Sequence, residues 1–434
     1  MAGAYFPRWT EKTEGVIAPT ERLPWSQTFA LGIQHVVAMF GATVLAPLIM
    51  GFNPNVAILM SGIGTLLFFV VVGGRVPSYL GSSFAFIGVV IAASGYAGSG
   101  PNANIGVALG GIIACGALYA AIGIAVMAAG TGWIERFMPP VVTGAVVAVI
   151  GLNLAPIAVK SVGTTIFDGW MAVITILCVG GVAVFTRGLL QKLLILAGLV
   201  AAYLVYLALA NGMGLGKPIE FAGIGKAAWL GLPAFAAPVF SAEAMLLIAP
   251  VAIILVAENL GHIKAVSAMT GQDLDRYMGR AFLGDGLATM VAGSAGGTGV
   301  TTYAENIGVM AATKVYSTLV FVVAACVAIV LGFSPKFGAL IQTIPSAVLG
   351  GVSIVVFGLI AVAGARIWVT NKVDFSDNRN LIVAAVTLVL GAGDFTLKIG
   401  GFAMGGIGTA TFGAILLYAL LAGGGRNTSG VADG

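Results

Sequence analysis

The chain has 434 residues, of which 59% are hydrophobic and only 8% are charged, and its mean hydropathy is +1.06. A soluble domain carries about 25% charged residues, so this composition excludes an ordinary soluble protein and indicates an all-α polytopic membrane protein within a lipid bilayer. The formal net charge of +4 comes from basic residues scattered over short loops, which argues against a nucleic-acid partner.

The two ends of the chain are predicted to be cytoplasmic tails. Residues 1–27 are polar and lack the basic, apolar and small-residue order of a cleaved signal peptide. Residues 422–434 are polar and rich in glycine. The cysteines each lie in an apolar run without a CxxC spacing, which favours small buried side chains over disulfides or metal ligands; they are Cys115, Cys178 and Cys326.

Hydropathy predicts the membrane-spanning segments, each of which needs about 20 apolar residues. Three stretches, residues 80–97, 280–292 and 298–313, are short or interrupted. The sequence therefore predicts about fourteen transmembrane segments. The other eleven are clear spans near residues 28–50, 55–73, 104–130, 138–158, 170–186, 190–209, 245–263, 315–333, 346–364, 379–394 and 403–421.

Lysine and arginine are distributed unevenly between the predicted loops. With the N-terminus inside, fifteen of the twenty fall on the cytoplasmic side and five outside. Cytoplasmic loops are enriched in these residues, so this orientation is favoured and both termini are predicted to be cytoplasmic. The chain then divides into a first repeat of seven spans at 28–209, an outer linker at 210–244 and a second repeat of seven spans at 245–421.

Two of the interrupted segments are predicted to enter the membrane from opposite faces. Residues 80–97 and 298–313 each begin with Gly, Ser and Thr, which break helices, and then become apolar. A helix from Glu305 to Lys314 is about 15 Å long, half of the roughly 30 Å hydrocarbon core, so it starts near the midplane. Two half-helices preceded by short extended pieces are typical of inverted-repeat transporters. The alternative is a pair of ordinary glycine-kinked helices.

Acidic residues inside the predicted spans indicate a functional site. Glu258 and Glu305 stand within spans, Asp285 in the short stretch 280–292 is a borderline case, and lysine and arginine occur only near the ends of spans. An isolated charge at a helix centre costs about 2.5–3.5 kcal/mol, so at least one carboxyl is expected to carry a proton during part of a cycle. This pattern predicts a proton-coupled carrier. The alternative is two permanent anions facing a water-filled cavity.

The same region indicates the kind of cargo. Carboxylates accept hydrogen bonds from N–H donors, and the N-termini of half-helices present free N–H groups. Phe84 and Tyr303 are predicted near the midplane, where they would offer a flat stacking surface. Together these groups favour a planar, neutral, amide-like ring over an anion, for which arginine or lysine would be expected.

The chain has only two histidines. His262 lies four residues after Glu258 on the same helix face, within reach of either glutamate, and His35 follows Gln34 in the first span. Either histidine could shuttle a proton; the alternative is a buried hydrogen-bonding group that holds helices together. The sequence contains no nucleophile–base pair, metal cluster or phosphate-loop motif, so we expect a transporter rather than an enzyme, with no cofactor besides the coupled proton.

Residues 305–314, ENIGVMAATK, resemble the signature of the nucleobase–ascorbate transporter family. In that signature Gln, Glu or Pro is followed by N-x-G-x-x-x-x-T and then Arg, Lys or Gly. The positions are filled here by Glu305, Asn306, Gly308, Thr313 and Lys314. The blocks LGIQHVVAMFGATVLAP, AENLGHIKAV and IPSAVLGGVSIVVFG are also similar to family blocks, in the same order along the chain. Glu at 305 resembles the uracil-permease branch more than the xanthine and urate branch.

The resemblance implies a fourteen-helix, seven-plus-seven inverted repeat that forms a homodimer. A core domain would hold spans 1–4 and 8–11, and a gate domain spans 5–7 and 12–14. It also implies roles for individual residues. Glu258 and Glu305 would bind the nucleobase and couple protons with His262, and Phe84, Tyr303 and Ala304 would line the site. Supporting roles would fall to Gln34, His35, Asn306 and Phe357. Ala304 and Phe357 stand where Gly and Tyr are expected.

The function expected from the sequence is proton-coupled import of a pyrimidine nucleobase, with uracil favoured, across the bacterial inner membrane by alternating access. One alternative is a purine symporter of the same fold, whose site would have to be larger. The other is an uncoupled nucleobase facilitator or channel, whose flux would ignore the proton gradient.

Overall fold

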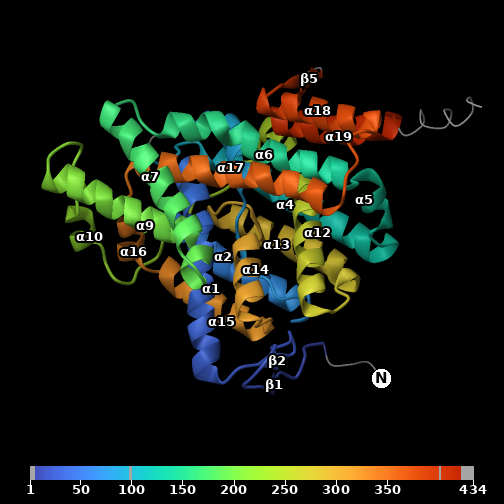
Figure 1. The fold of residues 1–434 in the computed structure, drawn as a ribbon, viewed down its shortest axis with the longest axis horizontal. Coiled ribbons are helices and arrows are strands. Elements are labelled where there is room, and N and C mark those ends of the chain that lie inside the picture. The colour runs from blue at the N-terminus through green and yellow to red at the C-terminus, as the bar shows by residue number, and fades with distance from the viewer. Residues whose placement is uncertain (1–4, 97–99, 400–401, 422–434) are drawn as a thin grey trace, which may run out of the picture. The chain divides into compact units, whose positions relative to one another are not determined.

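The computed structural model describes residues 5–96, 100–399 and 402–421, and the predicted tail 422–434 therefore lies outside the described residues. All fourteen predicted segments form helices (Figure 1). The first seven are α1 (Trp25–Met50), α2 (Pro54–Val71), α3 (Ile87–Ser94), α4 (Ile105–Ala129), α6 (Pro140–Ser161), α7 (Ile166–Phe185) and α9 (Leu194–Leu207). The second seven are α12 (Val251–Thr270), α13 (Met278–Ala295), α14 (Ala304–Thr313), α15 (Thr318–Gly332), α17 (Ser346–Thr370), α18 (Asn378–Ala392) and α19 (Gly406–Leu421).

Length and apolarity separate these helices into groups. Within the described residues, eight helical stretches are long and apolar enough to cross a membrane, among them α1, α2, α4 and α17. The α15 helix bends by 86° into the short α16 (Pro335–Ile341), and α18 and α19 are shorter apolar helices. The remaining short elements are α5 (Gly132–Phe137), α8 (Leu189–Lys192), η2 (Ala208–Gly212), α10 (Ala222–Lys226), α11 (Ala242–Ile248) and η3 (Asp275–Tyr277).

The order of elements repeats once along the chain. In the first half a strand, β3 (Leu80–Ser82), is followed by a one-turn 3₁₀ helix, η1 (Phe84–Phe86), and α3. In the second half β4 (Val300–Thr302) leads into α14, and the two strands start 220 residues apart. A short helix also precedes α6 and α17 in turn, α5 in the first case and α16 in the second.

The strands β3 and β4 pair with each other in antiparallel register. Leu80 lies opposite Thr302, and Ser82 lies opposite Val300. The backbone N–H groups flanking the pair are also used: Ser83 donates to the Gly299 carbonyl oxygen at 2.9 Å, and Tyr303 donates to that of Tyr79 at 3.1 Å. Extended backbone inside a membrane must find its hydrogen-bond partners within the protein. An extended piece before each half-helix is thus confirmed, and the alternative of two kinked continuous helices is wrong. The first piece was predicted at SSFAF (82–86), but its last three residues form the 3₁₀ helix η1.

Backbone contacts divide the chain into two compact units. The first comprises residues 1–129 and 157–355, and the second comprises residues 130–156 and 356–434. All spans that the family resemblance assigns to the core lie in the first unit. The helices α7 and α9, which it assigns to the gate, also pack within the first unit, where Gly41 of α1 faces Ile195 of α9.

Glycines allow α4 and α13 to pack closely inside the first unit. A Cβ atom on Gly116 would lie 2.7 Å from the Gly286 carbonyl oxygen, and one on Gly123 would lie 2.8 Å from that of Gly279. Small residues at such crossings let two membrane helices approach until their backbones touch. This contact brings Asp285 of α13 next to Tyr119 of α4.

Two further strand pairs lie outside the helices. Residues before α1 form β1 (Thr10–Glu11) and β2 (Glu21–Arg22), which pair in parallel. In the second unit β5 (Leu397–Ile399) and β6 (Phe402–Met404) form an antiparallel hairpin between α18 and α19.

Candidate functional site

The site is built where the two half-helices begin, at the β3–β4 pair. Ser83 caps the first of them, since its hydroxyl accepts a hydrogen bond from the Ala85 N–H at 3.3 Å. The second begins at Tyr303 without any side-chain cap. The N-terminus of α14 therefore presents its N–H groups and the positive end of its dipole beside an exposed Ala304.

Two carboxylates lie at this helix start. Glu305 stands in the first turn of α14 and Glu258 in α12, and both side chains are partly exposed. They lie near enough to repel each other. Among the described residues, Glu258 has no hydrogen-bond or ion-pair partner, and the Glu305 carboxylate meets only the N–H of its own residue. The two carboxylates therefore have unused acceptor capacity at the start of α14.

The two predicted aromatic residues differ in their surroundings. Phe84 is partly exposed at the start of η1. Tyr303 is only 4% exposed, and its hydroxyl donates to the Ser82 carbonyl oxygen at 2.7 Å and accepts from the Thr43 hydroxyl at 3.1 Å. Its ring packs against Gly81, where a Cβ atom would lie 2.5 Å away. The Tyr303 ring is therefore buried, whereas part of the Phe84 side chain is exposed at the helix start.

The histidines bind to neighbours other than the glutamates. His262 is hydrogen-bonded through Nδ1 to the hydroxyl of Thr302 at 2.8 Å, so it contacts β4 rather than Glu258 or Glu305. His35 is buried, and both its Nδ1 atom and its carbonyl oxygen accept from the Asn306 amide at 3.0 Å. This pair ties α1 to α14 directly behind Glu305.

Two predicted positions, Gln34 and Phe357, remain. Gln34 is partly exposed on α1, one residue before the buried His35. Phe357 is buried in α17 and belongs to the second unit, whereas all the residues above belong to the first.

A buried polar network beside the site was not predicted. Asp285 is fully buried in α13, and its Oδ2 atom accepts from the Asn259 amide at 2.6 Å and from the Tyr119 hydroxyl at 3.4 Å. Its Oδ1 atom has no partner among the described residues. Asn259 in turn accepts from Thr302 at 3.3 Å, so the network continues to His262. The signal in the sequence was Asn259, which directly follows Glu258, together with Asp285 in the short predicted stretch 280–292.

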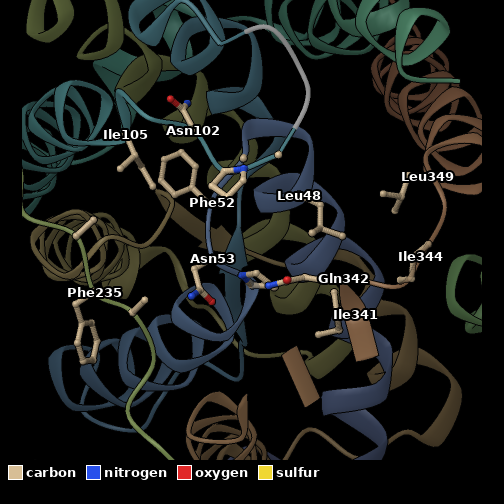
Figure 2. Close-up of a pocket in the computed structure, with 16 residues that line it drawn as sticks. Leu48, Phe52, Asn53, Asn102, Ile105, Phe235, Ile341, Gln342, Ile344 and Leu349 are labelled. Atoms are coloured by element: carbon tan, nitrogen blue, oxygen red, sulfur yellow. The ribbon is translucent and has the colours of Figure 1, made fainter. Parts of the chain in front are cut away.

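A separate cavity of about 560 Å³ lies at the loop ends of the first unit, which the predicted orientation puts outside (Figure 2). Figure 2 shows the Gln342 side chain reaching towards Asn53, with Phe52 and Phe235 also at the wall. None of the predicted site residues lines this cavity. The two glutamates, Phe84 and the open start of α14 therefore form the candidate site.

Comparison with known proteins identifies the family of the chain. Residues 26–400 match the model of the permease family. The chain is 70% identical to the putative pyrimidine permease RutG of Escherichia coli K12, over 97% of this chain and 96% of the relative. It is 42% identical to the uracil permease of Paenibacillus larvae, over 93% of this chain and 96% of that one.

Solved structures of the same fold are more distant in sequence. The transmembrane domain of the cyanobacterial bicarbonate transporter BicA superposes with a TM-score of 0.61 at 17% identity, covering 85% of this chain and 96% of that chain. Murine Slc26a9 in its inward-facing state gives 0.67 at 12% identity, covering 93% of this chain and 69% of that chain. These proteins share the seven-plus-seven inverted repeat, which confirms the predicted architecture. The chain thus belongs to the permease family, as a multi-pass membrane transporter and not an enzyme.

Proposed function

We propose that the protein imports a pyrimidine nucleobase, with uracil as the preferred cargo, together with a proton. The observation that carries this proposal is the pair of carboxylates at the uncapped start of α14, Glu258 and Glu305, which have no cationic partner within the part of the chain that the structure describes. Relatives named as pyrimidine and uracil permeases support the choice of cargo.

The site complements the edge and face of such a ring. A pyrimidine dione presents N–H donors and C=O acceptors on one edge, which match carboxylate oxygens and the free N–H groups of a helix start. The ring face would stack on Phe84. A neutral cargo also agrees with the composition of the site, because an anion would face two carboxylates there.

Electrostatics supports the proposed proton coupling. Two neighbouring carboxylates in a low-dielectric region repel each other and lose hydration, so the pair holds a proton more readily than an isolated carboxylate in water. Cargo N–H groups favour the charged form of the carboxylate that they bind, while the second carboxyl stays neutral. Binding of cargo and proton would then be linked, and movement of the site between the two faces of the membrane would carry both.

Uptake into proteoliposomes tests the proposal. Radiolabelled uracil should accumulate when an inward proton gradient is imposed, and excess unlabelled thymine should block this accumulation while xanthine should not. Block by xanthine would instead indicate a purine carrier. Uptake that only equilibrates, with or without the gradient, would indicate a facilitator and would contradict proton coupling.

The setting of the transporter is part of the proposal. We place it in the bacterial inner membrane as a homodimer with both termini cytoplasmic, in line with the lysine and arginine distribution and the family resemblance. Labelling of single cysteines introduced at Val16 and in the 210–244 linker, with a membrane-impermeant reagent on intact spheroplasts, tests the orientation. Only the linker position should react.

A further inference from the structure

The residues before α1 are bound to the helices rather than free. We name residues 5–23 the N-terminal strap, because they run across the ends of α2, α14 and α15. Arg280, near the start of α13, also lies over the Tyr5 ring at 5.7 Å. All of these elements belong to the first unit. A polar N-terminal stretch without apolar periodicity would normally leave the first span untouched.

The first anchor of the strap is the end of α2. The Tyr5 hydroxyl lies 2.8 Å from the Val70 carbonyl oxygen and 3.0 Å from that of Val71. The Phe69 ring is stacked by Phe6 at 5.7 Å and by Trp9 at 5.9 Å, with interplanar angles of 14° and 20°. Three aromatic residues of the strap thus hold one helix end.

The second anchor is the end of α14. Lys314 ends this helix with a φ of 55°, and its carbonyl oxygen accepts from the Ile17 N–H at 3.1 Å. The Ile17 carbonyl oxygen accepts in turn from the Tyr316 N–H at 2.8 Å. The Ile17 side chain is 1% exposed and packs with Leu23, Val315 and Val320. The strap therefore continues the backbone hydrogen bonding where α14 stops.

Thr318 joins the two anchors at the start of α15. Its hydroxyl accepts from the Trp9 indole N–H at 2.9 Å and lies 3.1 Å from the carbonyl oxygens of both Pro19 and Gly74. Gly74 belongs to the α2–β3 connection, so this one side chain contacts the strap and the segment that leads to the first half-helix. Thr318 is 1% exposed.

Two ion pairs at the surface link residues within the strap to each other but contribute little to holding the strap in place. Lys12 lies 3.1 Å from Glu21, and Arg22 lies 2.7 Å from Glu11. Such pairs are screened by water, so the buried contacts of Ile17 and Trp9 fix the strap.

We propose that the N-terminal strap is a positioning element of the transport site. It holds the half-helix α14, and with it Glu305, in a fixed position relative to Glu258. The α14 helix has only ten residues, and Glu305 lies about 14 Å along the helix axis from Lys314. A rigid short helix transmits a tilt at one end to the other end. Freeing Lys314 from Ile17 therefore moves the Glu305 carboxylate relative to Glu258. The link to transport rests on the proposed function; the link between the strap and α14 does not.

Neighbouring residues of the strap provide a matched pair of variants. Ile17 is 1% exposed and Val16 is 48% exposed, although both are β-branched and adjacent. Ile17→Ala removes the buried side chain while keeping the backbone hydrogen bonds, and Val16→Ala removes a similar side chain from the surface. Ile17→Val serves as the conservative variant, and Trp9→Phe removes the indole donor to Thr318 while keeping an aromatic ring on Phe69.

Hydrogen–deuterium exchange of the purified full-length protein gives a readout that needs no transport. We expect Ile17→Ala to speed exchange of the 304–313 amides about tenfold, with α4 unchanged as the internal reference. Trp9→Phe should have a smaller effect in the same direction, and Val16→Ala and Ile17→Val should match the wild type. Unchanged exchange in α14 of Ile17→Ala would overturn the proposal, and so would an equal rise in α4, which would indicate general destabilisation.

Uptake assays on the same variants test the link to transport. We expect the KM for uracil to rise about tenfold in Ile17→Ala, with Val16→Ala like the wild type, because small displacements of a binding group are costly. If α14 exchanges faster while KM and the proton-to-uracil ratio stay unchanged, the strap does not position the transport site. If wild-type protein does not take up uracil at all, the proposed function fails, and the exchange experiment still decides whether the strap holds α14.

Discussion

The two half-helix segments share a backbone design and differ in chemistry. In each, a three-residue strand is followed after one residue by a helix start, at Phe84 in the first and at Ala304 in the second. The first start is capped by Ser83 and presents an aromatic ring. The second has no side-chain cap and carries Glu305 in its first turn.

This difference shows how a repeated fold produces an asymmetric site. The backbone geometry positions two helix starts at one strand pair, and side chains then decide which start satisfies its own N–H groups and which leaves them for a ligand. Chemistry of this kind is carried by individual residues placed on a fold, not by the fold itself. The following substitutions test that division of roles.

The largest effect is expected on the carboxylate side. Glu258→Ala should weaken uracil binding about 100-fold, because losing a hydrogen bond to a charged group costs roughly 1.5–3 kcal/mol and also leaves a cargo N–H unpaired. Calorimetry or equilibrium binding on purified protein measures this. An unchanged affinity would assign Glu258 a structural role and would remove it from the site.

Glu305→Gln is expected to separate binding from coupling. An amide cannot take up a proton, so gradient-driven accumulation should be lost, whereas exchange of labelled for unlabelled uracil across the membrane should continue at a reduced rate. Both are measured in the same proteoliposomes. Accumulation that still follows the proton gradient would show that Glu305 is not the group that titrates.

On the aromatic side we expect a smaller effect. Phe84→Ala should raise the Kd for uracil about tenfold, since stacking of a base on an aromatic ring contributes roughly 1–3 kcal/mol. Tyr303→Phe is the matched variant: it removes the hydrogen bonds to Ser82 and Thr43 and should leave the Kd unchanged while lowering stability by about 1 kcal/mol. A Kd raised by Tyr303→Phe and unchanged by Phe84→Ala would instead show that the Tyr303 hydroxyl, and not the Phe84 ring, contributes to binding.

The smallest effect concerns the helix cap. Ser83→Ala should lower the free energy of unfolding by about 1 kcal/mol, typical of a lost N-cap, without changing proton-coupled uptake. Thermal unfolding in detergent and uptake in proteoliposomes check both parts. A loss of coupling in this variant would mean that the first helix start takes part in the chemistry after all.

Much of the fold could be predicted because its signals are local. Apolar runs of membrane length marked the spans, and Gly, Ser and Thr followed by apolar residues marked both half-helices. The extended pieces were predicted at SSFAF (82–86) and TGVTTY (298–303), and the strands form at 80–82 and 300–302. The helix arithmetic from Lys314 also placed Glu305 at the start of a short helix, where the structure has it.

Other features depend on which side chains face each other, which periodicity does not reveal. His262 lies on the predicted face of α12, but Thr302, rather than a glutamate, lies opposite its ring. Tyr303 follows directly after a strand, where the side-chain direction alternates with each residue, so its burial depends on the register with β3. The N-terminal strap has the composition of a tail, and two residues that Trp9 contacts, Phe69 and Thr318, lie far along the chain.

The pairing of β3 with β4 also means that one strand is synthesised well before its partner. Thr302 is synthesised 222 residues after its partner Leu80. At about 5–20 residues per second, β3 is therefore without its partner strand for roughly 11–44 s. Until then the polar backbone of residues 80–82 needs a temporary partner, such as water or the insertion machinery, because lipid supplies none. In nascent chains arrested before residue 300, the first half-helix should therefore not reach its final position. It reaches that position only when the second repeat supplies β4.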